Sequence, residues 1–328
     1  MKTSVHLRKS GYDPFFDFTK GICILCVIWL HTIPKAETGA VFWASQAVPL
    51  FLFMQVFHAL KRGGIRFPDW RKLFRRIILP YVVTLVLICI LRSSLQGKFH
   101  LTLRAGPGAY YPFVYIQFAV LIPLFARFAR AFKGHFRTAL LAATLLASIA
   151  SELVASWIHV PNLVWIYLCA RYLFIIGLAA FWLEGRIRLT PWTFLLSLAS
   201  LCFLWLFRYA GFKWPPFFFD TPWSQCHWVC YFHPAFLCPV LLGIFYRKSA
   251  KCLKKPLIAL GKASYEIFLM QMAVIPLLGT CFQSGESAAH IALVWTLSLG
   301  LGLVLHRLPG RRRRGPTAPH PQQPLAGT

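Results

Sequence analysis

The sequence FDFTKGICILCVIWLHTIP, residues 16–34, contains an apolar run that is long enough to cross a lipid bilayer. A membrane-crossing helix needs about 20 mostly apolar residues, and nine further runs of this kind follow along the chain. The ten predicted spans are residues 15–33, 41–60, 77–91, 110–125, 139–160, 163–183, 192–207, 228–246, 257–281 and 289–305. A backbone in lipid must satisfy its hydrogen bonds internally, and the alternating pattern of a membrane barrel is absent. The sequence therefore predicts an all-α polytopic membrane protein with about ten transmembrane helices.

The composition supports this class and excludes a soluble one. The 328 residues are 58% hydrophobic and 13% charged, whereas about a quarter of the residues are charged in an ordinary soluble domain. A formal net charge of +26 would by itself indicate a nucleic-acid-binding protein. The apolar runs are too long for a soluble core, so we expect membrane lipids rather than nucleic acid around the chain.

Lys and Arg are distributed unevenly between the predicted loops. Alternate segments hold 27 of the 35 on one side of the membrane and six on the other. The positive-inside rule then places both termini in the cytoplasm. The remaining two cations, Arg171 and Lys262, fall within predicted spans. We expect one transmembrane domain over residues 1–306, followed by a basic, Pro-rich, disordered cytoplasmic tail over residues 307–328.

The first predicted span carries three ionisable residues, Asp17, Lys20 and His31. Ionisable groups within a bilayer are costly and indicate a functional site by default. Asp17 precedes Lys20 by three residues, so the two side chains can pair. Eleven residues make about three helical turns, so Lys20 and His31 share one face and lie about 16 Å apart along the axis. His31 is either a functional residue or a polar side chain at the membrane interface.

A second pair of charges, Glu152 and Arg171, is expected deeper in the bilayer. The fifth and sixth spans form a hairpin through Pro161 and Asn162. At about 1.5 Å per residue, both charges lie about 12–14 Å below that turn. The main expectation is a structural ion pair between them. The alternative is that Glu152 reaches His31.

Basic residues also gather in the second cytoplasmic loop, where Arg71, Lys72, Arg75 and Arg76 directly precede the third span. One interpretation is topology together with attraction to anionic lipid head groups. The other is a clamp for the phosphates of an anionic cytosolic ligand. Composition alone leaves both open.

Cysteine and histidine residues cluster near the start of the eighth span, at Cys226, His227, Cys230 and His233. Zinc accepts such ligands. The Cys–x2–Cys spacing of common zinc sites is absent, so we expect no metal.

Five motifs in this order resemble the acyltransferase-3 family of bacterial membrane O-acyltransferases. They are FDFTKGICILCVIWLHTIP (16–34), VPLFLFMQVFHAL (48–60), RKLFRRIILPY (71–81), YYPFVYIQFAVLIPLF (110–125) and LGKASYEIFLMQ (260–271). Where the family usually has Arg, Ser-Gly and His, this chain has Lys20, Gln55-Val56 and Gln271.

The resemblance implies an activity and a location. The family transfers an acyl group, usually acetyl, from cytosolic acyl-CoA to a hydroxyl of a surface glycan or lipid-linked saccharide. It is found in the bacterial cytoplasmic membrane. We therefore expect an O-acetyltransferase that uses acetyl-CoA as the donor. The acceptor, the identity of the acyl group and the oligomeric state stay open.

The resemblance also implies roles for particular residues. His31 takes the role of the family's essential histidine, either as a general base or as the carrier of the acyl group. Its expected catalytic companions are Lys20, Asp17 and Glu152. The expected ligands for the CoA phosphates are Arg71, Lys72, Arg75 and Arg76. The candidate channel residues are Tyr115, Gln117, Arg171, Tyr265 and Gln271, for which helix–helix hydrogen bonding is the alternative.

Two other functions are compatible with the same residues. A transporter or flippase for a lipid-linked sugar or an anion would use the buried charges as a pathway. A non-catalytic scaffold in a glycan-assembly complex would need none of them. Incubation with labelled acetyl-CoA distinguishes all three.

Overall fold

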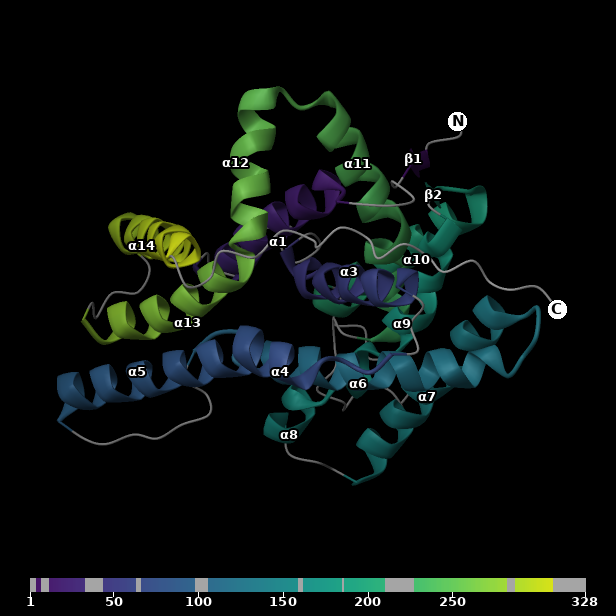
Figure 1. Cartoon of the computed structure of the whole chain (residues 1–328), viewed down its shortest axis with the longest axis horizontal. Helices are drawn as coiled ribbons and strands as arrows, with labels where there is room; N and C mark the ends of the chain where they lie inside the picture. Colours follow the sequence, from purple (N-terminus) through teal and green to yellow (C-terminus); the bar gives the residue numbers. More distant parts are fainter. Residues whose placement is uncertain are drawn as a thin grey trace.

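The computed structural model describes residues 4–6, 12–32, 44–62, 66–97, 106–158, 162–184, 186–209, 227–281 and 287–308 (Figure 1). The predicted tail from residue 309 onward lies outside the described residues, as do Cys226 and the Pro161 turn. The domain boundary at residue 306 therefore stays a prediction.

The described chain is helical apart from one short pair of strands, which confirms the all-α class. Antiparallel strands β1 (Ser4–His6) and β2 (Arg186–Arg188) pair with Ser4 opposite Arg188. The helices of the first half are α1 (Pro14–Thr32), α3 (Ala47–Lys61), α4 (Trp70–Leu73), the π-helix η1 (Phe74–Ile78), α5 (Leu79–Gln96), α6 (Tyr111–Arg130) and α7 (Phe136–Ile158). Those of the second half are α8 (Asn162–Tyr167), η2 (Cys169–Tyr172), α9 (Phe174–Ala179), η3 (Ala180–Glu184), α10 (Pro191–Tyr209), η5 (Trp228–Tyr231), η6 (His233–Leu237), α11 (Cys238–Lys248), α12 (Lys251–Lys262), α13 (Ser264–Cys281) and α14 (Ala288–Arg307).

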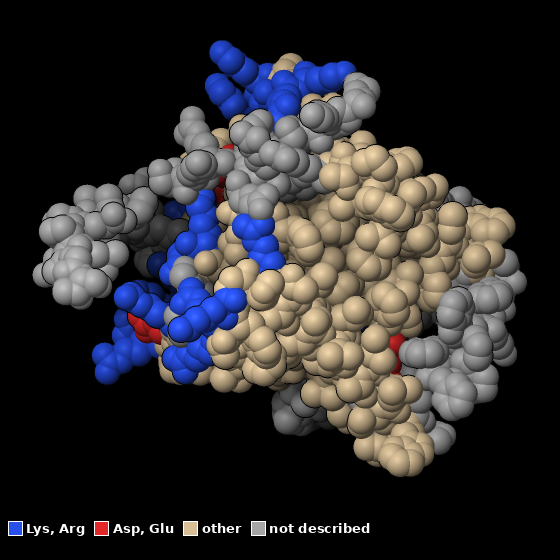
Figure 2. Space-filling model, turned by 90° about the vertical axis from the view of Figure 1, so that its right-hand side faces the viewer, with Lys and Arg blue, Asp and Glu red and all other residues tan. Residues whose placement is uncertain are grey.

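Six helices in the described residues are long and apolar enough to cross a membrane. A seventh span results if α12 and α13, which meet at a bend of 71°, count as one. Three shorter apolar helices cover Ala47–Lys61, Cys169–Leu183 and Pro191–Leu206. Each of the ten predicted segments is thus helical, but ten crossings are not confirmed. In Figure 2, Lys and Arg gather toward the top and the left of the view, and the centre of this face is a broad surface of uncharged residues.

The sixth segment, predicted as one helix over residues 163–183, is broken after α8. Leu168 has an extended backbone, with φ −86° and ψ 138°, and a 3-10 turn follows. The side chain of Gln117 on α6 satisfies the backbone on both sides of this break. Its Nε2 donates to the Tyr167 oxygen at 2.7 Å, and its Oε1 accepts from Cys169 N at 3.0 Å. A broken helix is tolerated within a membrane where neighbouring groups restore its hydrogen bonds in this way.

Helices α1 and α12 cross in backbone contact at two glycines. A Cβ atom on Gly21 would overlap the backbone oxygen of Leu257, and one on Gly261 would overlap that of Asp17. Small residues allow membrane helices to approach this closely. The crossing sets the first turns of α1, including Asp17 and Lys20, directly against the end of α12.

Candidate active site

One large cavity lies among α1, α3, α6, η2, the start of α13 and the segment before α5. Its volume is about 1210 Å³, above the range of about 300–1,000 Å³ of typical small-molecule sites. Residues from the whole length of α1 line it, from Asp17 and Lys20 to His31. The predicted shared face of Lys20 and His31 is therefore confirmed, because both side chains border the same space.

The start of α1 is held by a short network around Asp17. Lys20 Nζ lies 3.2 Å from Asp17 Oδ1, which confirms the predicted pair. Tyr12 donates its hydroxyl to Asp17 Oδ2 at 2.8 Å, and Lys262 lies over the Tyr12 ring at 5.3 Å. Burial, together with this hydrogen bond and the charge of Asp17, raises the pKa of Tyr12 well above its usual value. Tyr12 therefore stays a hydrogen-bond donor at neutral pH and keeps the carboxylate next to Lys20.

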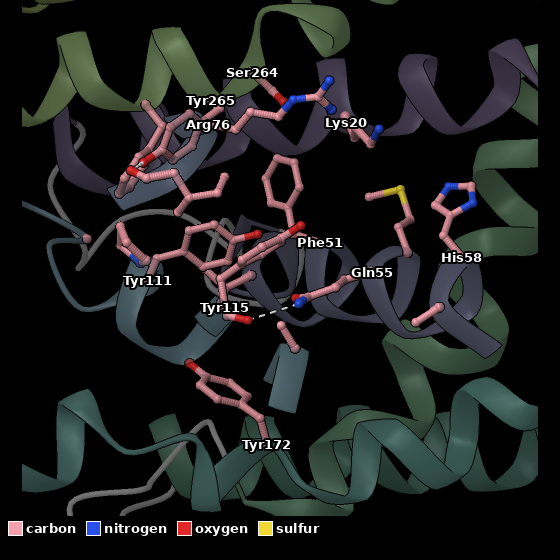
Figure 3. Close-up of a pocket in the computed structure, with 18 of the residues that line it drawn as sticks. Lys20, Phe51, Gln55, His58, Arg76, Tyr111, Tyr115, Tyr172, Ser264 and Tyr265 are labelled. Atoms are coloured by element: carbon pink, nitrogen blue, oxygen red, sulfur yellow. Dashed lines mark hydrogen bonds between the residues drawn. The ribbon is translucent and has the colours of Figure 1, made fainter. Parts of the chain in front are cut away.

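Several cations line the cavity. Lys20, Arg62, Arg66, Arg76 and Lys262 all line it, together with the acidic residues Asp17 and Asp69. In Figure 3, Lys20 and Arg76 reach into the same space, with Ser264 close to Arg76 and His58 beyond Lys20. The rings of Phe16 and Phe57 pack against His58, at 4.6 and 5.5 Å. Such a group of cations suits a ligand with several phosphates.

The predicted basic clamp of four residues is divided by the structure. Only Arg76 lines the main cavity. Arg71 and Arg75 line a separate shallow groove with Trp70 and Phe74. Lys72 is exposed and pairs with Asp69 at 3.1 Å. The four residues therefore do not line one space, because neighbouring positions on one helix point to different sides, and their role in donor binding stays a prediction.

Arg76 lies within a π-helical turn. The turn η1 follows α4 directly, and Tyr265 on α13 donates its hydroxyl to the Ile77 backbone oxygen at 2.7 Å. Single π-turns within helices occur frequently at functional sites. The hydrogen bond ties the residue after Arg76 to the opposite wall of the cavity.

The middle of the cavity is aromatic. Tyr111 lies near Phe51, Tyr115 and Phe268, with ring centroids 6.0, 6.2 and 5.7 Å away. Gln55 Nε2 donates to the Tyr115 backbone oxygen at 2.9 Å, marked by the dashed line in Figure 3. Among the described residues Gln55 Oε1 has no hydrogen-bond partner, although it is buried. It is available to accept a hydrogen bond from a ligand.

Arg171 occupies another part of the wall and is buried. Its guanidinium lies between the rings of Tyr110 and Tyr172, at 4.8 and 4.7 Å. It also donates to the Ile166 backbone oxygen at 3.2 Å. The break in the sixth segment thus places this cation at the cavity.

Glu152 is elsewhere, which corrects the predicted pair with Arg171. Its Oε2 lies 3.2 Å from Nε2 of His227, and both side chains are buried. Val229 N donates to His227 Nδ1 at 3.3 Å, and the Phe203 ring stacks on the imidazole. Glu152 does not line the cavity, so neither its expected contact with Arg171 nor the alternative approach to His31 is found. The start of the eighth segment packs against α7, and no pattern in the sequence indicates that contact.

The remaining predicted channel residues divide in the same way. Tyr115, Arg171 and Tyr265 line the cavity, whereas Gln117 and Gln271 do not. Gln117 supports the helix break, as helix–helix hydrogen bonding predicted. Gln271 is fully buried on α13, and neither of its amide atoms has a partner within the described part of the chain.

Several cavity residues were missed by the sequence reasoning. His58 lies on α3, whereas Arg62 and Arg66 come after its end at Lys61, so helical spacing could not have grouped the three residues. The sequence places Lys262 within a predicted span but assigns it no role. For a metal, no suitable group of three His, Cys, Asp or Glu ligands exists among the described residues, and Cys226 lies outside them.

The apolar helices and the cavity among them define a multi-pass helical membrane protein with an internal cavity. Comparison with known families gives its identity. The model of a family described as "Acyltransferase domain" matches residues 13–307, nearly the whole chain. The chain therefore belongs to the acyltransferase-3 family and is a membrane acyltransferase. No curated protein and no solved structure matches it.

Proposed function

We propose that this protein is an O-acetyltransferase of the bacterial cytoplasmic membrane, with ten spans and both termini in the cytoplasm. In this proposal it moves an acetyl group from cytosolic acetyl-CoA to a hydroxyl of a cell-surface or lipid-linked saccharide. The observation that carries the proposal is that one cavity joins a group of cations to His31.

The cations are assigned to the donor. CoA carries phosphates, and Arg pairs with phosphate through two parallel hydrogen bonds. Arg62, Arg66 and Arg76 supply such groups, and Lys262 adds a point charge. The axial distance of about 16 Å from Lys20 to His31 suits an extended pantetheine arm between the phosphates and the reacting thioester.

His31 is assigned to proton transfer. A saccharide hydroxyl is a weak nucleophile at neutral pH, and an imidazole can accept its proton as the hydroxyl attacks. The new C–O bond forms at the acetyl carbonyl, the C–S bond breaks, and the proton passes from His31 to the leaving CoA thiolate. The indole of Trp295 on α14 donates to Thr32 Oγ1 at 3.0 Å, which holds the end of α1 that carries His31.

The aromatic middle of the cavity is assigned to the acceptor. Tyrosine side chains combine an apolar ring face with a polar hydroxyl. Three of them, Tyr111, Tyr115 and Tyr172, line the cavity. This suits a saccharide, which has both C–H faces and hydroxyls. The volume of about 1210 Å³ exceeds what a typical small ligand fills and leaves room for parts of two substrates.

Purified protein in lipid nanodiscs, supplied with labelled acetyl-CoA and a panel of lipid-linked and polymeric saccharides, tests the proposal. We expect label in a saccharide ester, and we expect His31→Ala to abolish it. The matched control is His135→Ala, which changes an exposed histidine between α6 and α7. Saccharide movement across a bilayer without acetyl-CoA would instead identify a flippase. Label retained on the protein would identify His31 as an acyl carrier.

A further inference from the structure

Arg71 and Arg75, which do not line the cavity, line a separate groove. Trp70, Arg71, Phe74 and Arg75 line it, and all four belong to α4 and η1. Trp70 lies four residues before Phe74, and Arg71 lies four residues before Arg75, so the members of each pair are neighbours on the helix surface. Arg76, one position further, borders the cavity instead. The groove is therefore a site distinct from the one that holds the proposed donor.

This face continues into the lipid-facing side of α5. Trp70 is 53% exposed and Phe74 is 49% exposed. The same helix exposes further large apolar side chains, which are Leu79, Val82, Val83, Val86, Leu87, Ile90 and Leu91. An apolar surface of this extent on a membrane-crossing helix faces acyl chains. The groove thus opens at one end of a lipid-facing stripe.

The depth of the groove follows from its charges. Four cations between residues 71 and 76 cannot lie in hydrocarbon, so this end of the helix is at the head-group level. Tryptophan is enriched at that level, because its ring is amphipathic. Arg71 and Arg75 have no ion-pair partner among the described residues, whereas Lys72 is neutralised by Asp69 at 3.1 Å. Two uncompensated guanidinium groups therefore face the head groups.

We propose that Trp70, Arg71, Phe74 and Arg75 form a binding site for the phosphate of an anionic phospholipid. The two guanidinium groups bind the phosphodiester, and the two aromatic rings pack on the glycerol and the upper acyl chains. A phospholipid is the expected occupant rather than the phosphates of a soluble donor, because the groove opens onto the lipid-facing side of α5. This site does not depend on the acyltransferase reaction.

Trp70 is a built-in probe of the site. The protein is placed in phosphatidylcholine nanodiscs that contain increasing fractions of phosphatidylglycerol brominated near the carbonyl end of its acyl chains. The fluorescence difference between the wild type and Trp70→Phe isolates the Trp70 signal. We expect brominated phosphatidylglycerol to quench it at a lower mole fraction than brominated phosphatidylcholine does. Equal quenching by both lipids would overturn the proposal.

Charge variants identify the groups that bind. We expect the preference for phosphatidylglycerol to fall roughly fivefold for each arginine replaced by glutamine in Arg71→Gln and Arg75→Gln. Arg71→Lys with Arg75→Lys should keep much of it, which shows that the fold is intact. The matched control is Lys251→Gln with Lys255→Gln, two exposed cations on α12. An equal loss in the control would show a net-charge effect and sink the idea. So would an increase in the KM for acetyl-CoA in the double glutamine variant without any change in lipid preference.

Discussion

The hydroxyl of Tyr265 donates a 2.7 Å hydrogen bond to the backbone oxygen of Ile77, a residue 188 positions earlier in the chain. It joins the start of α13 to the π-turn that carries Arg76. Arg76, the cation that we propose binds the donor, is therefore next to a contact between two helices that are far apart in sequence.

Tyr265→Phe removes this contact and leaves the ring in place. One hydrogen bond contributes about 1 kcal/mol, so we expect the KM for acetyl-CoA to rise roughly fivefold with little change in kcat. Steady-state kinetics in nanodiscs measure both. The effect should not add to that of Arg76→Gln, because both changes act through the same guanidinium. A lower kcat at unchanged KM would show that Tyr265 acts on the reacting groups instead.

Arg76 lines the cavity, whereas Arg71, on the same helix, lines the separate groove. Loss of a charged hydrogen bond costs about 1.5–3 kcal/mol, so Arg76→Gln should raise the KM for acetyl-CoA roughly 10- to 100-fold. Arg71→Gln should leave it unchanged, since Arg71 does not line the cavity. The pair of variants has the same charge change. Equal increases in KM for both variants would support the prediction that the four basic residues bind the donor together.

His31→Ala should lower turnover by about 10²–10⁴-fold, the range for loss of a general acid–base group. His135→Ala should have no effect. Esterified label per mole of folded protein is the measurement, with size-exclusion chromatography as the check on folding. Undiminished turnover in His31→Ala would remove this residue from the mechanism.

Gly261 and Gly279 offer a matched test of the crossing between α1 and α12. A Cβ on Gly261 would overlap the Asp17 backbone oxygen, whereas a Cβ on Gly279 meets nothing within 4 Å. Overpacking costs about 1–3 kcal/mol, so Gly261→Ala should lower the thermal unfolding midpoint in detergent. Gly279→Ala should keep or raise it, because Ala has the higher helix propensity. Equal midpoints would mean that the helices can separate without cost.

Glu152→Ala tests whether this carboxylate is structural. Glu152 Oε2 lies 3.2 Å from Nε2 of the buried His227. Leaving a buried polar group without its partner costs about 1–3 kcal/mol, so the unfolding midpoint should fall. Turnover per folded molecule should be unchanged, because Glu152 lies outside the cavity. The same loss of stability in His227→Ala would confirm the pair. A folded Glu152→Ala protein without activity would instead support the predicted catalytic role of Glu152.

The amino-acid sequence by itself determined the class of the protein and the organisation of its first span. Its long apolar runs predict membrane helices, because a backbone in hydrocarbon has no water to bind and must form its own hydrogen bonds. Spacing within one helix was sufficient for the Asp17–Lys20 pair and for the shared face of Lys20 and His31, since helical geometry relates near neighbours directly. The five motifs, spread over residues 16–271, were sufficient for the family, which the match over residues 13–307 confirms.

Only the tertiary structure decided which distant residues meet. Arg76 lines the cavity and Arg71 and Arg75 do not, because this helix packs against α13, where Tyr265 donates to the Ile77 backbone oxygen. Glu152 pairs with His227 because the start of the eighth segment folds against α7. Arg171 reaches the cavity because Gln117 stabilises a break in its helix. Each of these depends on a contact between segments 50 or more residues apart in the chain, and periodicity within one segment carries no information about its partner.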